Sequence, residues 1–327
     1  MACATDLGHW GGVMEYRTLG RTGLRVSLAG LGTGGPSNFG QNRGTTQADA
    51  QRLVCRALDC GINFFDTAQG YRESEAMLGH ALQGVPRDQY IVATKYTYQD
   101  GAGTPIAPSA VEAAIEQSLR CLRIETIDVE QVHGLAPEHY DAVIAAHLPV
   151  LERARAAGKI RHIGVSETFG GDAKHAMLGR ALADGHFATA MVAYNLLHQT
   201  AERTVFPRAQ AAGVGVIIMV AVRRVLGDPQ RLRETIAHLK ARRLLADDAL
   251  PDDDALGWLV HDGVGSVPAA AYKFALEPAA VSTVLTGTAN PDHLDANVTA
   301  IAGGPLPTAD RQRLQALFGH LEEGLGN

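Results

Sequence analysis

The chain contains the segments INFFDTAQGY at residues 62–71, YIVATK at residues 90–95 and DVEQVH at residues 128–133. In the first two segments a short apolar run leads to a charged residue, and the third segment ends in a histidine. Runs that are apolar on both faces are typical of parallel strands covered by helices. Further runs of this kind occur along the chain, and together they predict eight strands, at residues 28–31, 64–67, 90–95, 128–133, 162–166, 191–195, 215–220 and 281–287.

The segments between these runs carry signals for the start of helices. Thr46 with Asp49, and Ser109 with Glu112, have the spacing of a capping box. Asn290 is followed by a proline, which predicts an N-cap and a first-turn proline ahead of another apolar stripe. Strands therefore alternate with helices through most of the length.

Eight strands with helices between them, in 327 residues, predict an α/β fold of the (β/α)8 or TIM-barrel type. Residues 14–327 are expected to form this single domain, with an N-terminal β-hairpin at residues 16–26, a charged helical insertion at residues 228–250 and a helical C-terminal tail. Residues 1–13 lack the cationic start and apolar core of a secretory signal. We interpret them as a leader, which is a tag, an alternative start or a disordered tail.

A glycine-rich segment raises a competing fold. Residues 30–35, GLGTGG, match the GxGxxG fingerprint of a doubly wound, dinucleotide-binding sheet. That fingerprint needs a helix at its third glycine and an acidic residue about twenty positions further on. Pro36 follows at once, and no strand ends in Asp or Glu at that distance. We therefore interpret these glycines as the loop after the first barrel strand.

Composition excludes several classes of partner. The formal net charge is −6, and acidic and basic residues are interspersed, which argues against a nucleic-acid or basic membrane surface. The most apolar tract, around residues 217–220, is too short to span a bilayer. The four cysteines, at positions 3, 55, 60 and 121, form no CxxC pair and no metal-ligand spacing. We expect them to be thiols in a reducing, cytoplasmic protein.

Four polar residues occupy comparable places at or just after predicted strands. Asp66, Lys95 and His133 end three consecutive strands, and Tyr71 lies in the loop after the first of them. Singly, such residues are more often a turn residue, a solvated cation or a hydrogen-bonded core histidine. The C-terminal ends of barrel strands, however, meet on the face where active sites form. Their joint placement therefore predicts a catalytic constellation.

These residue types suit the interconversion of a carbonyl and an alcohol. Hydride delivery to a carbonyl leaves an alkoxide, which requires a positioned proton donor such as Tyr71. An ammonium at Lys95 would stabilise the tyrosinate that remains, and a carboxylate at Asp66 would hold that ammonium. A neutral His133 would orient and polarise the carbonyl. The scheme needs no metal, and no cluster of ligands in the sequence offers one.

Around this constellation the chain resembles the aldo-keto reductase superfamily, and the resemblance covers nearly the whole sequence from Met14 onward. The matching segments are YRTLG at 16–20, FDTA at 65–68 with Tyr71, ATK at 93–95, ID at 127–128, QVH at 131–133, GKIR at 158–161, GVS at 164–166, YN at 194–195 and GTANP at 287–291, with Leu294 and Asn297. The resemblance implies that Asp66, Tyr71, Lys95 and His133 form a catalytic tetrad with the tyrosine as general acid. It also implies a nicotinamide dinucleotide across the barrel mouth.

The resemblance further implies which residues contact the cofactor. Gly32 and Thr33 would lie under the nicotinamide ribose, and Ser166 would reach the carboxamide. The adenosine end would be held by Thr288, Asn290 and Asn297, where free N–H groups of a helix start suit an anion. The remaining expected cofactor contacts are Asp66, Met191, Met219, Arg223, Arg224, Gly287 and His293.

Several positions depart from the family pattern near the nicotinamide. Met191 replaces a carboxamide-binding glutamine, and Glu167 replaces the asparagine that follows the serine. Met219 stands where an aromatic ring commonly stacks on the nicotinamide. Methionine is apolar and adaptable enough to serve such a contact.

Other departures concern the cofactor phosphate. Gly287 and Ala289 stand where lysine or arginine is frequent, and His293 where arginine or glutamine is frequent. Arg223 and Arg224 could supply positive charge by another route, or could be a solvated loop. The resemblance favours NADP(H), with NAD(H) as the alternative.

The leading hypothesis is thus an NAD(P)H-dependent oxidoreductase acting on a small aldehyde, ketone or sugar lactol. A non-catalytic nicotinamide-binding redox sensor or regulatory subunit is the alternative from another class. A barrel lyase or isomerase would need a phosphate-binding loop and a dedicated base, and neither is evident. The sequence predicts neither the physiological substrate nor the oligomeric state.

Overall fold

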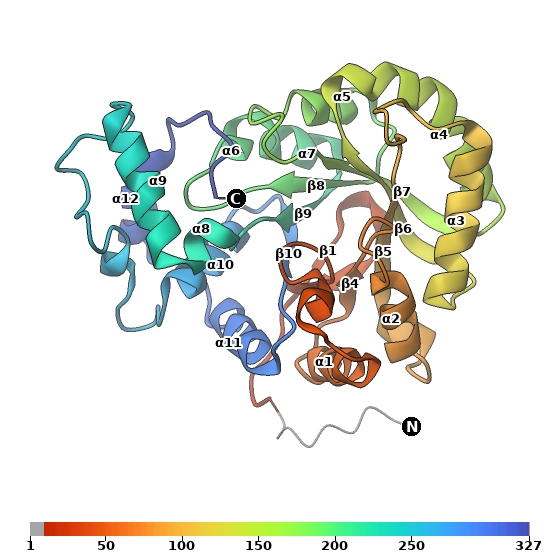
Figure 1. The fold of residues 1–327 in the computed structure, drawn as a ribbon, viewed down its shortest axis with the longest axis horizontal. Coiled ribbons are helices and arrows are strands. Elements are labelled where there is room, and N and C mark those ends of the chain that lie inside the picture. The colour runs from red at the N-terminus through yellow and green to blue at the C-terminus, as the bar shows by residue number, and fades with distance from the viewer. Residues whose placement is uncertain (1–9, 327) are drawn as a thin grey trace.

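The computed structural model describes residues 10–326 and contains a closed barrel of eight parallel strands. Every predicted barrel strand is confirmed, with ends that differ by a few residues. The strands follow one another around the barrel in chain order, with the last beside the first (Figure 1). They are β3 (Ala29–Gly32), β4 (Phe64–Asp66), β5 (Ile91–Tyr96), β6 (Ile127–Leu135), β7 (Ile160–Glu167), β8 (Thr189–Ala193), β9 (Gly215–Met219) and β10 (Val281–Thr286).

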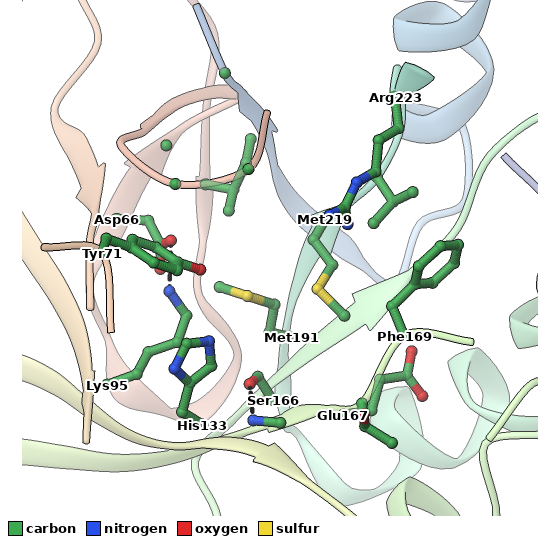
Figure 2. A pocket seen from close by; sticks show the side chains of 18 of the residues that line it. Asp66, Tyr71, Lys95, His133, Ser166, Glu167, Phe169, Met191, Met219 and Arg223 are labelled. Atoms are coloured by element: carbon green, nitrogen blue, oxygen red, sulfur yellow. Dashed lines mark hydrogen bonds and ion pairs between the residues drawn. The ribbon is translucent and has the colours of Figure 1, made fainter. Parts of the chain in front are cut away.

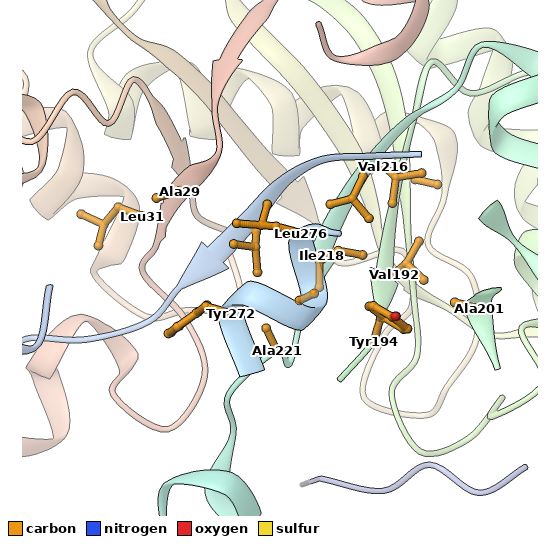
Figure 3. Packing of buried hydrophobic residues seen from close by; sticks show 14 of the residues in the cluster. Ala29, Leu31, Val192, Tyr194, Ala201, Val216, Ile218, Ala221, Tyr272 and Leu276 are labelled. Carbon is orange, nitrogen blue, oxygen red and sulfur yellow. The ribbon is translucent and has the colours of Figure 1, made fainter. Parts of the chain in front are cut away.

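Helices surround the barrel and connect the strands (Figure 1). They are α1 (Gln47–Asp59), α2 (Ser74–Ala81), α3 (Pro108–Leu122), α4 (Tyr140–Ala156), α5 (Ala176–Asp184), α6 (Ala201–Thr204), α7 (Phe206–Ala212), α8 (Arg224–Gly227), α9 (Pro229–Ala241), α10 (Val267–Leu276), α11 (Pro291–Ala302) and α12 (Thr308–Phe318). Apolar side chains between the strands and these helices form the large outer core of the barrel. Figure 3 draws part of it, with Val192 of β8, Ile218 of β9 and Leu276 of α10.

Two of the three predicted helix starts are confirmed. The N–H of Asp49 donates to Thr46 Oγ1, and the N–H of Thr46 donates to Asp49 Oδ2, which is a complete capping box. Asn290 caps α11 by accepting from the N–H of Asp292. The capping box expected at Ser109 is wrong. Pro108 is already the first residue of α3, so Ser109 lies inside the helix and no side chain caps it.

The predicted hairpin closes the N-terminal end of the barrel. It consists of the antiparallel strands β1 (Tyr16–Thr18) and β2 (Arg25–Ser27). Leu19 and Val26 are fully buried and pack with the inner core of the barrel, which includes Phe64 and Ile217. Each such side chain contributes about 1.5–3 kcal/mol through burial. Because this end is filled, the opposite end, where the strands terminate, is left to form a site.

The insertion and the C-terminal tail are also helical, as expected. The insertion contains α9, and α12 belongs to the tail. After α12 the chain returns to the mouth of the barrel, where His198 contacts the carbonyl of Glu323 at 2.7 Å and Asn195 Nδ2 donates to the carbonyl of Leu325. The tail therefore packs against the loop that follows β8.

Most of the predicted leader, residues 1–9, lies outside the described residues, and the division at residue 14 stays a prediction. Cys55 is disulfide-bonded, so the expectation of a thiol is wrong there; a disulfide joins positions that sequence spacing does not reveal. Cys60 and Cys121 are free. Between residues 10 and 326, no helix has both the length and the apolar character needed to cross a membrane.

Candidate active site

A cavity of about 350 Å³ opens at the C-terminal end of the barrel strands (Figure 2). Its lining brings together residues from all eight barrel strands and from the loops that follow β3, β4, β7, β9 and β10. Of the residues predicted from the sequence, the cavity is lined by Gly32, Asp66, Tyr71, Lys95, His133, Ser166, Met191, Met219, Arg223 and Gly287.

The deepest polar feature of the cavity is an ion pair between Asp66 and Lys95. Lys95 Nζ donates to Asp66 Oδ2 at 2.7 Å and to the carbonyl of Thr67 at 2.8 Å. Both side chains are at most 3% exposed. Burial lowers the pKa of Lys95, but the Asp66 carboxylate and the Tyr71 hydroxyl more than reverse this and raise it. The lysine is therefore held as an ammonium at the base of the cavity.

Tyr71 is positioned by a tight loop after β4 and by a close glycine. Its N–H donates to the carbonyl of Ala68 at 3.0 Å. A Cβ at Gly34 would lie only 2.3 Å from the Tyr71 ring, so this approach of ring and backbone requires glycine. Lys95 Nζ lies 5.0 Å from the centre of the ring. The phenol is thus placed beside the ammonium.

His133 completes this side of the cavity. Its ring meets the Tyr71 ring edge to face, with 5.4 Å between the ring centres. The adjacent Gly134 has a positive φ of 62°, and the pairing of β6 with β7 shifts register here. Burial and the Lys95 charge lower the pKa of His133 to about 3. His133 is therefore a neutral imidazole that can donate or accept a hydrogen bond.

This pKa gives a testable consequence for His133→Gln. In the unfolded chain histidine titrates near pH 6.5, whereas in the fold it stays neutral down to about pH 3. The stability that a neutral His133 contributes is present above the unfolded value and is lost as pH falls towards 3. Urea unfolding from pH 7 to pH 4 should therefore show a smaller loss of stability in His133→Gln than in the unsubstituted chain. Equal losses would show that His133 titrates normally in the fold.

The opposite wall of the cavity combines large apolar side chains with one cation. Met191 is the middle residue of β8, Met219 ends β9, and Phe169 lies in the loop after β7 (Figure 2). The guanidinium carbon of Arg223 lies 5.6 Å from the centre of the Phe169 ring. Its Nε atom is buried without a hydrogen-bond partner. This wall can accept a flat apolar ring next to an anionic group.

The structure places the other predicted residues outside this lining. Thr33 is fully buried, and its N–H donates to the carbonyl of Asp66 at 2.9 Å. Arg224 is exposed at the start of α8. The remaining predicted contacts lie further along the loop after β10 or on α11, and they are Thr288, Asn290, His293 and Asn297.

Among the residues at the site that the sequence did not indicate, Gln131 and Phe169 contact predicted ones. Gln131 Nε2 donates to Asp66 Oδ1 at 3.4 Å, and Phe169 supports Arg223. Gln131 precedes His133 by two positions on β6, so the period of a strand places it on the same face. Phe169 gave no signal, because an aromatic residue in a loop has no diagnostic spacing.

A model of the aldo/keto reductase family matches residues 30–318. The chain belongs to the aldo-keto reductase family.

Two curated relatives and one solved structure show the degree of similarity. L-galactose dehydrogenase of Arabidopsis thaliana is 36% identical over 159 residues, 47% of this chain and 48% of that protein. NADH-specific methylglyoxal reductase of Escherichia coli (strain K12) is 30% identical over 227 residues, 62% and 66% of the two chains. The alignments thus span only half to two thirds of these relatives. An aldo-keto reductase of Bacillus halodurans in its holo form superposes with a TM-score of 0.71, 26% identity and coverage of 94% and 97%.

In this aldo-keto reductase the structure shows the contacts of Glu167, which stands where the family pattern has an asparagine. The two carboxylate oxygens of Glu167 are held at 2.7 Å by His175 Nδ1 and by the N–H of Ala193. His175 Nε2 continues the network to Thr200 Oγ1 at 2.9 Å. The carboxylate is therefore engaged in a buried network that links β7 with the loop after β8. The hydroxyl of Ser166 accepts from the N–H of Gly134 at 2.7 Å, donates to the carbonyl of Val132 at 3.4 Å and lies on the cavity wall.

Proposed function

We propose that this chain interconverts a carbonyl and an alcohol with a nicotinamide cofactor, and that Tyr71 is the general acid. The observation that carries the proposal is the buried Lys95–Asp66 pair beside Tyr71, with a neutral His133 on the same cavity. Carbonyl reduction needs a proton donor, a cation that stabilises the donor's conjugate base and a neutral hydrogen-bond donor. The cavity supplies all three.

The roles of the side chains follow from their placement. A bound nicotinamide would supply or accept the hydride. Tyr71 gives its hydroxyl proton to the oxygen of the reduced carbonyl, and the Lys95 ammonium stabilises the phenolate that is left. Asp66 keeps Lys95 charged in a buried position. His133 donates a hydrogen bond to the same carbonyl oxygen and orients it.

The residues present fit a nicotinamide cofactor. Met191 and Met219 offer an apolar wall for the ring, and Ser166 offers a hydroxyl for the carboxamide. The Asn290-capped start of α11 presents backbone N–H groups of the kind that bind anions. We accordingly propose Gly32, Asp66 and Gly287 in the cavity, with Thr33 through its backbone, as further contacts. At the adenosine end we propose Thr288, Asn290, His293 and Asn297.

The identity of the cofactor phosphate is a separate question. The family resemblance favours NADP(H). Gly287 and Ala289 provide no positive side chain, and one relative is named as NADH-specific, which supports NAD(H). We propose Arg224, which is exposed at the start of α8, as a contact of the cofactor phosphate. Arg223 is a second candidate for this contact, but it also lines the catalytic cavity.

A paired assay tests the proposal. NADH and NADPH are titrated separately into the protein, and the decrease of nicotinamide absorbance is followed with reactive aldehydes such as 4-nitrobenzaldehyde. We expect turnover with at least one cofactor, and a difference in affinity of about tenfold or more between the two. Tight binding of either cofactor without turnover of any carbonyl would favour the sensor hypothesis. That alternative has some structural support, because Glu167 is engaged elsewhere and Met191 offers the carboxamide no amide.

A further inference from the structure

Arg223 is the uncompensated charge of the cavity. Four residues on the lining carry ionisable side chains of the Asp, Glu, Lys and Arg types, namely Asp66, Lys95, Glu167 and Arg223. Asp66 and Lys95 neutralise each other at 2.7 Å. Glu167 is engaged by His175 and by the N–H of Ala193. Among residues 10–326, no carboxylate forms an ion pair with Arg223, and its Nε has no hydrogen-bond partner.

The guanidinium is held in a position that faces the acid. It packs against the ring of Phe169, and Arg223 is the residue that directly precedes α8. Figure 2 shows it on the wall across from Tyr71, with Met191 and Met219 between them. Burial lowers the pKa of Arg223, which Tyr71 opposes, but a guanidinium stays protonated at neutral pH. A partly buried cation without a partner is costly for the free protein, and a bound anion would offset that cost.

We propose that Arg223 binds a carboxylate on the substrate, so that the preferred substrates are small carbonyl acids rather than neutral aldehydes. This inference rests on the proposed function and assigns its substrate class. A planar guanidinium can bind a carboxylate through two parallel hydrogen bonds. With the carboxylate on Arg223, the carbonyl would be directed towards Tyr71 and His133 across the cavity.

A cofactor phosphate is also an anion that a guanidinium could bind, but the position of Arg223 favours the substrate carboxylate. Arg223 shares its cavity with Tyr71, Lys95 and His133. The residues proposed for the adenosine end, on α11 and the loop before it, do not line this cavity. The cavity is also small, at about 350 Å³, so that a group bound at Arg223 lies near the reacting carbonyl.

The test compares an acid with its ester. Initial rates are measured for 4-carboxybenzaldehyde and for methyl 4-formylbenzoate, which differ in charge but little in shape, using the cofactor that supports turnover. Arg223→Met keeps an apolar stem against Phe169 and removes the charge. Arg233→Met, which removes one exposed positive charge from α9, is the matched control. Affinity for the cofactor is titrated for each variant.

We expect Arg223→Met to lower kcat/KM for the acid by about 30-fold and for the ester by less than about threefold, because a charge-assisted hydrogen bond is lost only with the acid. Arg223→Lys should recover part of the acid's rate, and Arg233→Met should leave both rates unchanged. An equal loss with acid and ester, together with weaker cofactor binding, would assign Arg223 to the cofactor phosphate and overturn the proposal. So would an unsubstituted chain that treats acid and ester alike.

A binding measurement separates this inference from the proposed function. Calorimetric titration of benzoate into the cofactor-loaded protein needs no turnover. Benzoate affinity that is lost in Arg223→Met, in a chain that reduces no aldehyde, would support the anion site and refute the oxidoreductase proposal. Benzoate binding that is equal in both proteins would refute the anion site.

Discussion

Tyr71→Phe is expected to lower kcat by about 10³-fold or more while changing cofactor affinity by less than about threefold. The substitution removes only the hydroxyl that is proposed to deliver the proton, and general acids contribute about 10²–10⁴ to the rate. The Phe ring can keep the contacts that fix Tyr71, which are the edge-to-face packing on His133 and the close approach to Gly34. Steady-state kinetics and a cofactor titration measure the two quantities separately.

A second tyrosine provides the control for this experiment. Tyr16 lies in the hairpin at the closed end of the barrel, where its hydroxyl donates to the carbonyl of Gly61 at 2.8 Å. Tyr16→Phe should keep full turnover. If Tyr71→Phe retained most of its rate, another group would have to supply the proton. Lys95 would then have no phenolate to stabilise.

The barrel could be predicted from the sequence because its strands are buried on both sides. The inner core and the outer helical layer both demand apolar residues, so the strands read as short runs of Val, Ile, Phe and Tyr. The placement of Asp66, Lys95 and His133 on one cavity followed from the same reasoning, since parallel strands end on one face. Tyr71 was placed with them because the loop that follows a barrel strand lies on the same face, and the family resemblance implied the same position.

Features that depend on partners from distant segments could not be predicted. The change at Glu167 is visible in the sequence, but its partner His175 lies in a loop and itself adopts a positive φ of 57°. Whether Arg223 has an ionic partner depends on the position and the contacts of every nearby carboxylate, which the sequence does not give. The start of α3 is different, because the sequence does contain a signal for it. Pro108 is typical of the first turn of a helix, but the capping-box spacing of Ser109 and Glu112 was given more weight.

Lys95→Met is expected to destabilise the fold by about 3–5 kcal/mol and to abolish turnover. Removing the ammonium leaves the Asp66 carboxylate buried with only the distant amide of Gln131 as a side-chain partner. Urea unfolding at pH 7 measures the loss of stability. A surface lysine–carboxylate pair is the control, because Lys174 and Glu322 lie 2.5 Å apart but are 68% and 54% exposed. Lys174→Met should cost less than about 1 kcal/mol.

The double variant Lys95→Met/Asp66→Asn separates stability from catalysis. It removes both charges, so most of the lost stability should return, whereas turnover should stay absent because no cation remains beside Tyr71. The pH dependence should also differ between the variants. In Lys95→Met the lone buried carboxyl is best accommodated protonated, so this single variant should recover stability as pH falls below neutral, and the double variant should not.

In the unsubstituted chain the change has the same sign but lies in a different pH range. The folded pKa of Lys95 is raised, so the stability it contributes is complete below the unfolded value near pH 10.4 and is lost only as pH rises further. If the single and double variants were equally unstable at every pH, the destabilisation would come from lost packing around the lysine stem. The Asp66–Lys95 pair would then stabilise the fold through packing rather than through the neutralisation of a buried carboxylate.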